Sequence, residues 1–259
     1  MDDNDAATGQ GDIRPRETSQ SPQAPGAPCP VVGIGASAGG LEAILALLEN
    51  LSPTLPAALV ALTHLPPDKP SSLDAVLASH TRMPVRMITG DTPPQPGTIH
   101  IPASGDDLGF SGGLLRPHSR EAGTLRHNID AFLADLAAAN GSRAVAVICS
   151  GTGTDGMQGA IRIAKAGGVV LVQDPAEAAH AGMPEAVIAA GAATAVLPMA
   201  EMARQLARLL ADVSCPEAEK DAFVDAALSL VKKHTGHDLT GYRTNTMARR
   251  IHKRMLLSG

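Results

Sequence analysis

Three residues whose side chains can together hydrolyse an ester each follow a predicted strand: Ser37, His64 and Asp155. A serine hydroxyl is a poor nucleophile until a neighbouring imidazole takes its proton, and a carboxylate then fixes the imidazole tautomer and stabilises its cation. The three groups must converge from separate parts of the chain. Ligands bind beyond the carboxyl ends of the strands in open parallel sheets, so loops at that edge allow such convergence. The pattern is compatible with a Ser-His-Asp triad.

Glycines surround two of these residues. Ser37 lies in the segment GIGASAGG, and Asp155 lies in SGTGTDG. Glycine lets the backbone turn sharply and approach a substrate closely. Ser37 also precedes a predicted helix, and the N–H groups at a helix start, here near Ala38 and Gly39, can stabilise an oxyanion.

Each residue also has an ordinary structural interpretation. Ser37 is a suitable N-cap for the helix that follows it, and Asp155 is equally suitable for the next predicted helix. His64 stands before two prolines and fits a simple loop position. The sequence alone leaves these interpretations open beside the triad.

A nucleotide site is an alternative function for the first glycine-rich segment. Gly33, Gly35 and Ala38 match the dinucleotide-binding fingerprint with its permitted terminal alanine. That fingerprint expects an acidic residue about 20 positions further on to hold the ribose, yet no acid occurs between Glu49 and Asp68. The chain also lacks the Gly-Lys-Ser/Thr sequence of a P-loop.

The elements that must position these residues follow an α/β pattern, in which short β-branched runs alternate with segments of helical period. Strands are predicted at 31–35, 59–63, 98–101, 144–149, 169–173 and 194–197. Helices are predicted at 41–48, 71–80, 129–140, 157–166, 184–190 and 199–210, the fifth with Pro184 in its first turn. Residues 107–117 predict a β-hairpin attached to the mainly parallel sheet.

Four segments make up the predicted organisation. Residues 1–30 are polar and proline-rich and predict a disordered tail. A catalytic domain follows at 31–211, then a linker at 212–220 and a short all-α segment at 221–259, with helices at 223–236 and 246–257. Because so few helical residues bury too little surface for a complete domain, we expect the chain to end inside a larger unit.

Composition excludes several classes of function. The net charge is −5 and aromatic residues make up 2% of the chain, so neither a basic footprint nor stacking platforms for nucleic acid are present overall. No apolar run is long enough to span a membrane, and no secretory signal is evident. The three cysteines are far apart, the histidines lack ligand spacing, and Cys149 ends an apolar strand. We therefore expect a cytoplasmic protein without a metal site, with Cys149 a small buried residue.

The segment 31–210 resembles the catalytic domain of the chemotaxis protein-glutamate methylesterases, the CheB family. The resemblance lies in GASAGG, in THLP at 63–66, in Arg126 with Asp130, in SGTGTDG and in GMP at 182–184. It implies a doubly wound, mostly parallel sheet with an antiparallel hairpin, and a triad of Ser37, His64 and Asp155. The implied reaction is the hydrolysis of glutamate methyl esters on the cytoplasmic domain of chemoreceptors, and in some members the deamidation of glutamine.

The chain departs from the family pattern near this site. Thr152 stands where a methionine usually helps to shape the oxyanion site, and Thr63 replaces a glutamine that often precedes the histidine. Where members of the family carry a phosphorylatable receiver domain, residues 1–30 predict only the proline-rich tail, so we expect no control by phosphorylation of that kind. We place Thr152 and Arg126 with Ala38 and Gly39 in the predicted oxyanion and substrate-binding site, for which the resemblance implies no cofactor.

The C-terminal segment, from Phe223 onward, resembles the start of the helical subdomain of the receptor methyltransferases, the CheR family. The resemblance lies in TGHDL at 235–239, in Tyr242 and in TMARRIHKRM at 246–255. S-adenosylmethionine would be a cofactor only if the remaining methyltransferase domain follows.

Residues 1–219 hold 13 basic and 23 acidic residues, whereas residues 220–259 hold 8 basic and 3 acidic residues. The basic tail is either a solvated helix face or a docking segment for an acidic receptor. The alternatives to a methylesterase are a catalytically silent signalling scaffold and a nucleotide-binding oxidoreductase.

Overall fold

The computed structural model describes residues 29–63, 72–119, 128–213 and 217–237. Seven parallel strands form one sheet in the order β3-β4-β2-β1-β7-β8-β9, and two antiparallel strands form a second sheet, β5-β6. The strands are β1 (Val31–Ala36), β2 (Ala58–Thr63), β3 (Val85–Ile88), β4 (Ile99–Pro102), β5 (Asp106–Ser111), β6 (Leu114–Ser119), β7 (Val145–Ile148), β8 (Val169–Gln173) and β9 (Ala195–Leu197). The helices are α1 (Gly40–Glu49), α2 (Leu73–His80), α3 (Asn128–Asn140), α4 (Met157–Lys165), α5 (Gly182–Ala189), α6 (Met199–Val213) and α7 (Glu217–Thr235).

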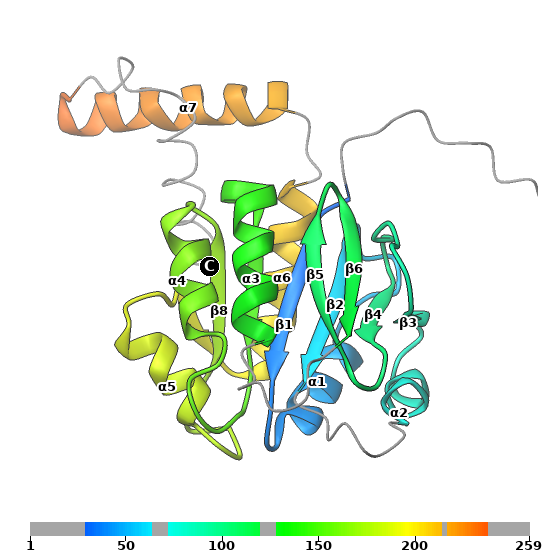
Figure 1. Ribbon diagram of the computed structural model, residues 1–259. Helices are drawn as coiled ribbons and strands as arrows, with labels where there is room; N and C mark the ends of the chain where they lie inside the picture. The colour runs from blue at the N-terminus through cyan, green and yellow to red at the C-terminus, as the bar shows by residue number, and fades with distance from the viewer. Residues whose placement is uncertain (1–28, 64–71, 120–127, 214–216, 238–259) are drawn as a thin grey trace, which may run out of the picture.

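Helices cover both faces of the large sheet (Figure 1). One apolar core joins the sheet to α1, α2 and α6, and the other joins it to α3, α4, α5 and the β5-β6 hairpin. Central strands such as β1, β2 and β7 are buried along their whole length. The continuous apolar runs of these strands therefore reflect coverage from both sides, as is usual for parallel sheets.

Two glycines of β1 bring α3 close to the sheet. A Cβ atom built on Gly33 would lie 2.6 Å from Cδ2 of Leu133, and one on Gly35 would lie 2.5 Å from Cγ2 of Ile129. A side chain at either position would force the neighbouring residue of α3 to move. The glycines that match a dinucleotide fingerprint in the sequence thus serve the packing of α3 on β1.

The connections of the sheet diverge between β1 and β7. Helix α1 links β1 to β2 on one face, whereas α4 links β7 to β8 on the other face. Such a divergence leaves a crevice beyond the carboxyl ends of the two strands, where ligands bind in open α/β sheets. Ser37 and the segment 150–156 directly follow these two strands.

The fold class predicted from the sequence is confirmed, with differences at the edges. The hairpin forms a sheet of its own, joined to the preceding chain by a bridge between Thr92 and Leu115. Strand β3 is absent from the predicted set because it lies at the sheet edge, where Arg86 and Met87 are exposed and interrupt the apolar pattern.

Helices extend into the segment that was predicted as a linker. Helix α6 continues to Val213 and α7 begins at Glu217, so helical structure occupies most of residues 212–220. As predicted, α7 stops before Gly236, whose φ of 73° favours glycine. Figure 1 shows α7 beyond the amino ends of the strands, away from the edge that carries Ser37. The tail at 1–28 and the helix predicted at 246–257 lie outside the described residues.

Among the described helices, none combines the length and the apolar character that crossing a membrane requires.

Candidate active site

Ser37 lies on a short turn between β1 and α1 whose backbone is fixed at both ends. Its N–H donates to the carbonyl of Ser150 at 2.9 Å, and its carbonyl accepts the N–H of Gly40 at 2.9 Å. The N-cap of α1 is Gly39, with a φ of 67°, and not Ser37. The N-cap interpretation of Ser37 is therefore wrong, and its half-buried side chain lies before the helix.

The loops after β1 and β7 meet beside Ser37. A Cβ atom on Gly151 would lie 2.9 Å from Cβ of Ser37 and would also collide with Met183 of α5. A Cβ atom on Gly39 would lie 2.6 Å from Cβ of Ala179. Glycine at both positions lets the loop before α5 join the other two around the turn that carries Ser37.

Asp155 is buried, and its carboxylate holds the start of α3. It accepts the N–H groups of Ile129 at 3.2 Å, of Asp130 at 2.9 Å and of its neighbour Gly156 at 2.9 Å. A negative charge at this point is stabilised by the partial positive charge of the helix N-terminus. Asp155 therefore does cap a helix, but that helix is α3 and not the following α4, whose N-cap is Gly156.

Helix α4 receives the reciprocal contact. Asp130, in the first turn of α3, accepts the N–H of Gly159 in the first turn of α4 at 2.8 Å. Each helix start is thus held by a carboxylate from the other helix or its preceding loop. This exchange fixes the SGTGTDG segment against α3 and, through β7, against the turn of Ser37.

The structure describes some of the other predicted site residues and not all of them. Ala38 and Gly39 are half-buried on the turn, and Thr152 is exposed on the loop after β7. His64 and Arg126 lie outside the described residues. The structure therefore brings Ser37, Ala38 and Gly39 together with the loop that carries Thr152 and Asp155, while the placement of His64 and Arg126 remains a prediction.

Two residues that sequence reasoning did not assign a role join these loops. The Ser150 hydroxyl donates to the Ala38 carbonyl at 2.8 Å, and the Ser150 N–H donates to Oε1 of Gln173 at 2.7 Å. Both side chains are buried at the carboxyl ends of apolar strands. A polar residue at the end of an apolar strand was the only sequence signal for their role. The contact itself could not be read from local spacing, because Ser150 and Ala38 are 112 residues apart in the sequence.

Further buried polar groups border this edge of the sheet. Among the described residues, the Thr63 hydroxyl at the end of β2 and the Asn128 carboxamide at the start of α3 have no hydrogen-bond partner. Both residues are almost completely buried. Since an unpaired buried polar group is costly, these two mark the polar character of the crevice.

Two other side chains with reactive groups, Cys149 and His100, are buried in the core. Cys149 is completely buried, as predicted, and burial raises the pKa of its thiol to about 12, which makes it unreactive. His100 is buried on β4, where Nδ1 contacts the Leu59 carbonyl at 3.3 Å and burial lowers the pKa of its imidazole. In the described part of the chain, no three His, Cys, Asp or Glu side chains are grouped as a metal site.

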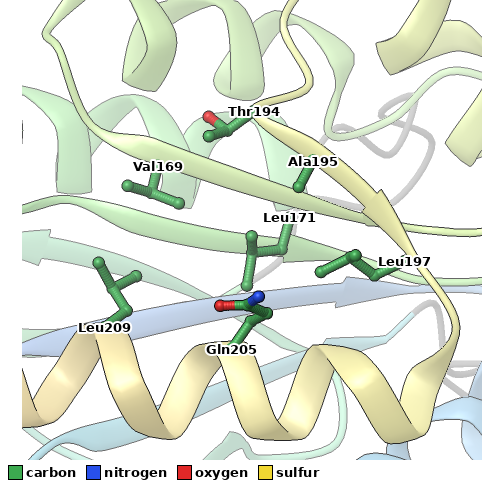
Figure 2. Close-up of a pocket in the computed structure, with 7 residues that line it drawn as sticks. All are labelled: Val169, Leu171, Thr194, Ala195, Leu197, Gln205 and Leu209. Atoms are coloured by element: carbon green, nitrogen blue, oxygen red, sulfur yellow. The ribbon is translucent and has the colours of Figure 1, made fainter. Parts of the chain in front are cut away.

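A small apolar cavity lies elsewhere. Its volume is about 50 Å³, and it opens between β8, β9 and α6. Figure 2 shows Gln205 and Leu209 of α6 pointing toward Leu171 and the two strands. The other lining residues are Val169, Thr194, Ala195 and Leu197. None of the predicted site residues lines it, so it is separate from the crevice at Ser37.

Comparison with known proteins identifies the domain that carries this geometry. Residues 32–206 match the model of the CheB methylesterase family. The chain belongs to this family. Residues 222–259 match the model of the all-alpha domain of CheR methyltransferases, so the methylesterase domain is followed by a methyltransferase segment.

Relatives and a solved structure agree with the family. A protein-glutamate methylesterase/protein-glutamine glutaminase of Burkholderia thailandensis is 35% identical over 198 residues, covering 76% of this chain and 57% of the relative. One of Pseudomonas aeruginosa is 32% identical, covering 78% and 61%. The chain thus spans little more than half the length of these relatives. The crystal structure of the Thermotoga maritima CheB methylesterase catalytic domain superposes with a TM-score of 0.64 at 30% identity, covering 70% of this chain and 98% of that one.

Proposed function

We propose that this member of the CheB family hydrolyses the γ-methyl esters of glutamate side chains on the cytoplasmic domain of chemoreceptors, with Ser37 as nucleophile. The observation that carries the proposal is the turn of Ser37 in a CheB domain, held between β1 and α1 and joined to the loop that carries Asp155. The names of the relatives supply the substrate class, methyl esters of protein glutamate. The reaction uses side chains, backbone N–H groups and water, so we expect it to need no cofactor.

In the proposed first step, Oγ of Ser37 attacks the ester carbonyl while His64 takes the hydroxyl proton. The N–H groups of Ala38 and Gly39 bind the resulting oxyanion. Collapse of the tetrahedral intermediate breaks the bond to the methoxy group, which leaves as methanol with the proton from His64. Water, deprotonated by His64, then releases the glutamate and regenerates Ser37.

Asp155 supports the imidazole in this proposal. A carboxylate accepts about four hydrogen bonds, and the three backbone N–H groups that Asp155 binds hold it in one orientation. A rigid carboxylate fixes the tautomer of His64 and stabilises the imidazolium that forms. We assign Arg126 and Thr152 to the proposed substrate-binding site as well.

The same site can deamidate glutamine. Attack of Ser37 on a side-chain amide gives the same acyl-enzyme and releases ammonia instead of methanol. The relatives named above carry both activities in their names. An amide is the less reactive substrate, so we expect deamidation to be the slower of the two reactions.

Replacement of Ser37 tests the proposal. Ser37→Ala should abolish methanol release from a methylated receptor fragment, a loss of about 10⁶-fold if the triad behaves as in serine proteases. The matched control is Ser111→Ala, which removes a hydroxyl from the exposed end of β5. Equal methanol release by Ser37→Ala and the parent chain would contradict the proposal.

Two further measurements separate the alternatives. A serine-directed fluorophosphonate should label the parent chain and Ser111→Ala but not Ser37→Ala; no labelling of the parent would favour a catalytically silent scaffold. A titration with nicotinamide dinucleotide should show no saturable binding, since Gly33 and Gly35 of the fingerprint lie within β1 and pack against α3.

A further inference from the structure

The hydroxyl of Ser150 connects two loops of the candidate site. It donates at 2.8 Å to the carbonyl of Ala38, which lies on the turn that carries Ser37, here called the nucleophile turn. It accepts the N–H of His180, before α5, at 3.0 Å. The carbonyl of His180 also lies 3.3 Å from the hydroxyl, a longer contact than the 2.8 Å bond to Ala38 and beyond the usual range for an O–H donor. The single hydroxyl proton is therefore directed to Ala38.

This bond sets the direction of a neighbouring N–H group. The Ala38 carbonyl and the Gly39 N–H belong to one planar trans peptide, so they point in opposite directions. Because Ser150 holds the carbonyl, it also aims the Gly39 N–H away from β7. The bond from Gly40 to the Ser37 carbonyl fixes the Ala38 N–H in the same way. Neither of these two N–H groups donates to another described residue.

Without the hydroxyl, the peptide between Ala38 and Gly39 would lose the hydrogen bond that orients its carbonyl. Gly39 already has a φ of 67° and, as a glycine, tolerates a wide range of backbone angles. Helix α1 begins only at Gly40, so helical hydrogen bonds do not hold this peptide. Its orientation depends on Ser150.

Ser150 is itself held rigidly. Its side chain is completely buried, its N–H donates to Oε1 of Gln173 at 2.7 Å, and its carbonyl accepts the N–H of Ser37 at 2.9 Å. A Cβ atom on Gly39 would lie 3.0 Å from the Ser150 hydroxyl and one on Gly40 would lie 2.9 Å from its carbonyl oxygen. The nucleophile turn thus rests on Ser150 through both its backbone and its side chain.

We propose that Ser150 is a positioning residue for hydrolysis, whose hydroxyl aims the Gly39 N–H at the oxyanion of the tetrahedral intermediate. This inference rests on the function proposed above. The oxyanion exists only after Ser37 has attacked, so misdirected N–H groups weaken stabilisation of the transition state more than binding of the ester. The effect of removing the hydroxyl should therefore appear in kcat and not in KM.

The test uses the full chain and a methylated receptor fragment. Ser150→Ala should lower kcat at least tenfold, up to about 100-fold, with KM within about twofold, and should slow fluorophosphonate labelling in proportion. Thr194→Val is the matched control: it removes a half-buried hydroxyl that accepts the Val170 N–H at 3.0 Å at the amino end of β9. It should leave kcat unchanged. Ser150→Cys fills the site with a slightly larger side chain that donates only a weak hydrogen bond. It should show the same loss, and it serves as the test if the alanine variant unfolds at the assay temperature.

The outcomes separate this inference from the proposed function. A loss of less than tenfold in kcat for the folded Ser150 variant, or a loss confined to KM, overturns the positioning role. An equal loss in Thr194→Val overturns it as well, since a general loss of stability would then explain the result. If Ser37→Ala keeps its activity, the proposed function fails independently of Ser150.

Discussion

Asp155→Asn is expected to destabilise the fold as well as the chemistry. The carboxylate is 4% exposed and accepts three backbone N–H groups, two at Oδ1 and one at Oδ2. A carboxamide can keep the two bonds at one oxygen, but its NH₂ group then faces the N–H of Ile129. The substitution also removes a negative charge from the N-terminus of α3.

The expected cost follows from these two losses. A buried donor without an acceptor costs about 1–3 kcal/mol, and the lost interaction of charge with the helix N-terminus costs about 1 kcal/mol. The total is roughly 2–4 kcal/mol. For a unit of this size, each kcal/mol lowers the Tm by about 2–4 °C, so Asp155→Asn should unfold roughly 5–15 °C below the parent chain.

Thermal and urea unfolding followed by circular dichroism measure this effect. The matched control is Asp174→Asn, whose carboxylate accepts a single exposed N–H, from Ala176 at 2.9 Å; it should change the Tm by no more than about 2 °C. Methanol release, assayed well below the Tm of the variant, should fall by about 10⁴-fold if Asp155 orients His64 as in serine proteases. Asp155→Asn with the Tm of the control would refute the structural role derived from the α3 contacts.

Two other substitutions test the packing and the buried charge. Gly33→Ala would place Cβ 2.6 Å from Leu133 and should cost about 1–3 kcal/mol in chemical denaturation, whereas Gly90→Ala, with open space around it, should be neutral; equal stabilities would contradict the close approach of α3. Burial lowers the pKa of His100 in the fold, so the unfolded chain binds this proton more readily and the free energy of unfolding should fall as the pH drops below about 6.5. His100→Gln should reduce that fall between pH 7.5 and 5.5, and an unchanged pH slope would show that His100 does not cause it.

The central strands could be predicted because burial on both faces requires a simple sequence pattern. Strands β1, β2, β7 and β8 are covered on both faces, so their sequences are continuous apolar runs, and the predicted limits of each differ from the observed ones by a residue at most. Strand β3 was not predicted because it lies at the sheet edge, where Arg86 and Met87 are exposed and the apolar run is broken. The pattern therefore predicts buried strands better than edges.

The candidate site could be predicted only in part. Serine and aspartate after apolar strands indicated two loops that the structure brings together, because loops at the carboxyl edge of a parallel sheet converge. The bond of Asp155 to α3 and the bond of Ser150 to Ala38 join residues that are distant in sequence, and no local spacing encodes them. Such contacts depend on which helix packs on which strand, and this packing is set in part by Gly33 and Gly35.

The same contacts connect the stability of the domain to the geometry of its proposed chemistry. Asp155 ties the β7 loop to α3, and Ser150, on the same loop, holds the turn of Ser37. Asp155→Asn therefore disturbs the packing of the β7 loop on α3 as well as the carboxylate itself. Loss of activity in Asp155→Asn cannot by itself demonstrate a contact with His64. Ser150→Ala provides the needed comparison, because it disturbs the turn of Ser37 while leaving the carboxylate of Asp155 and its three N–H partners in place.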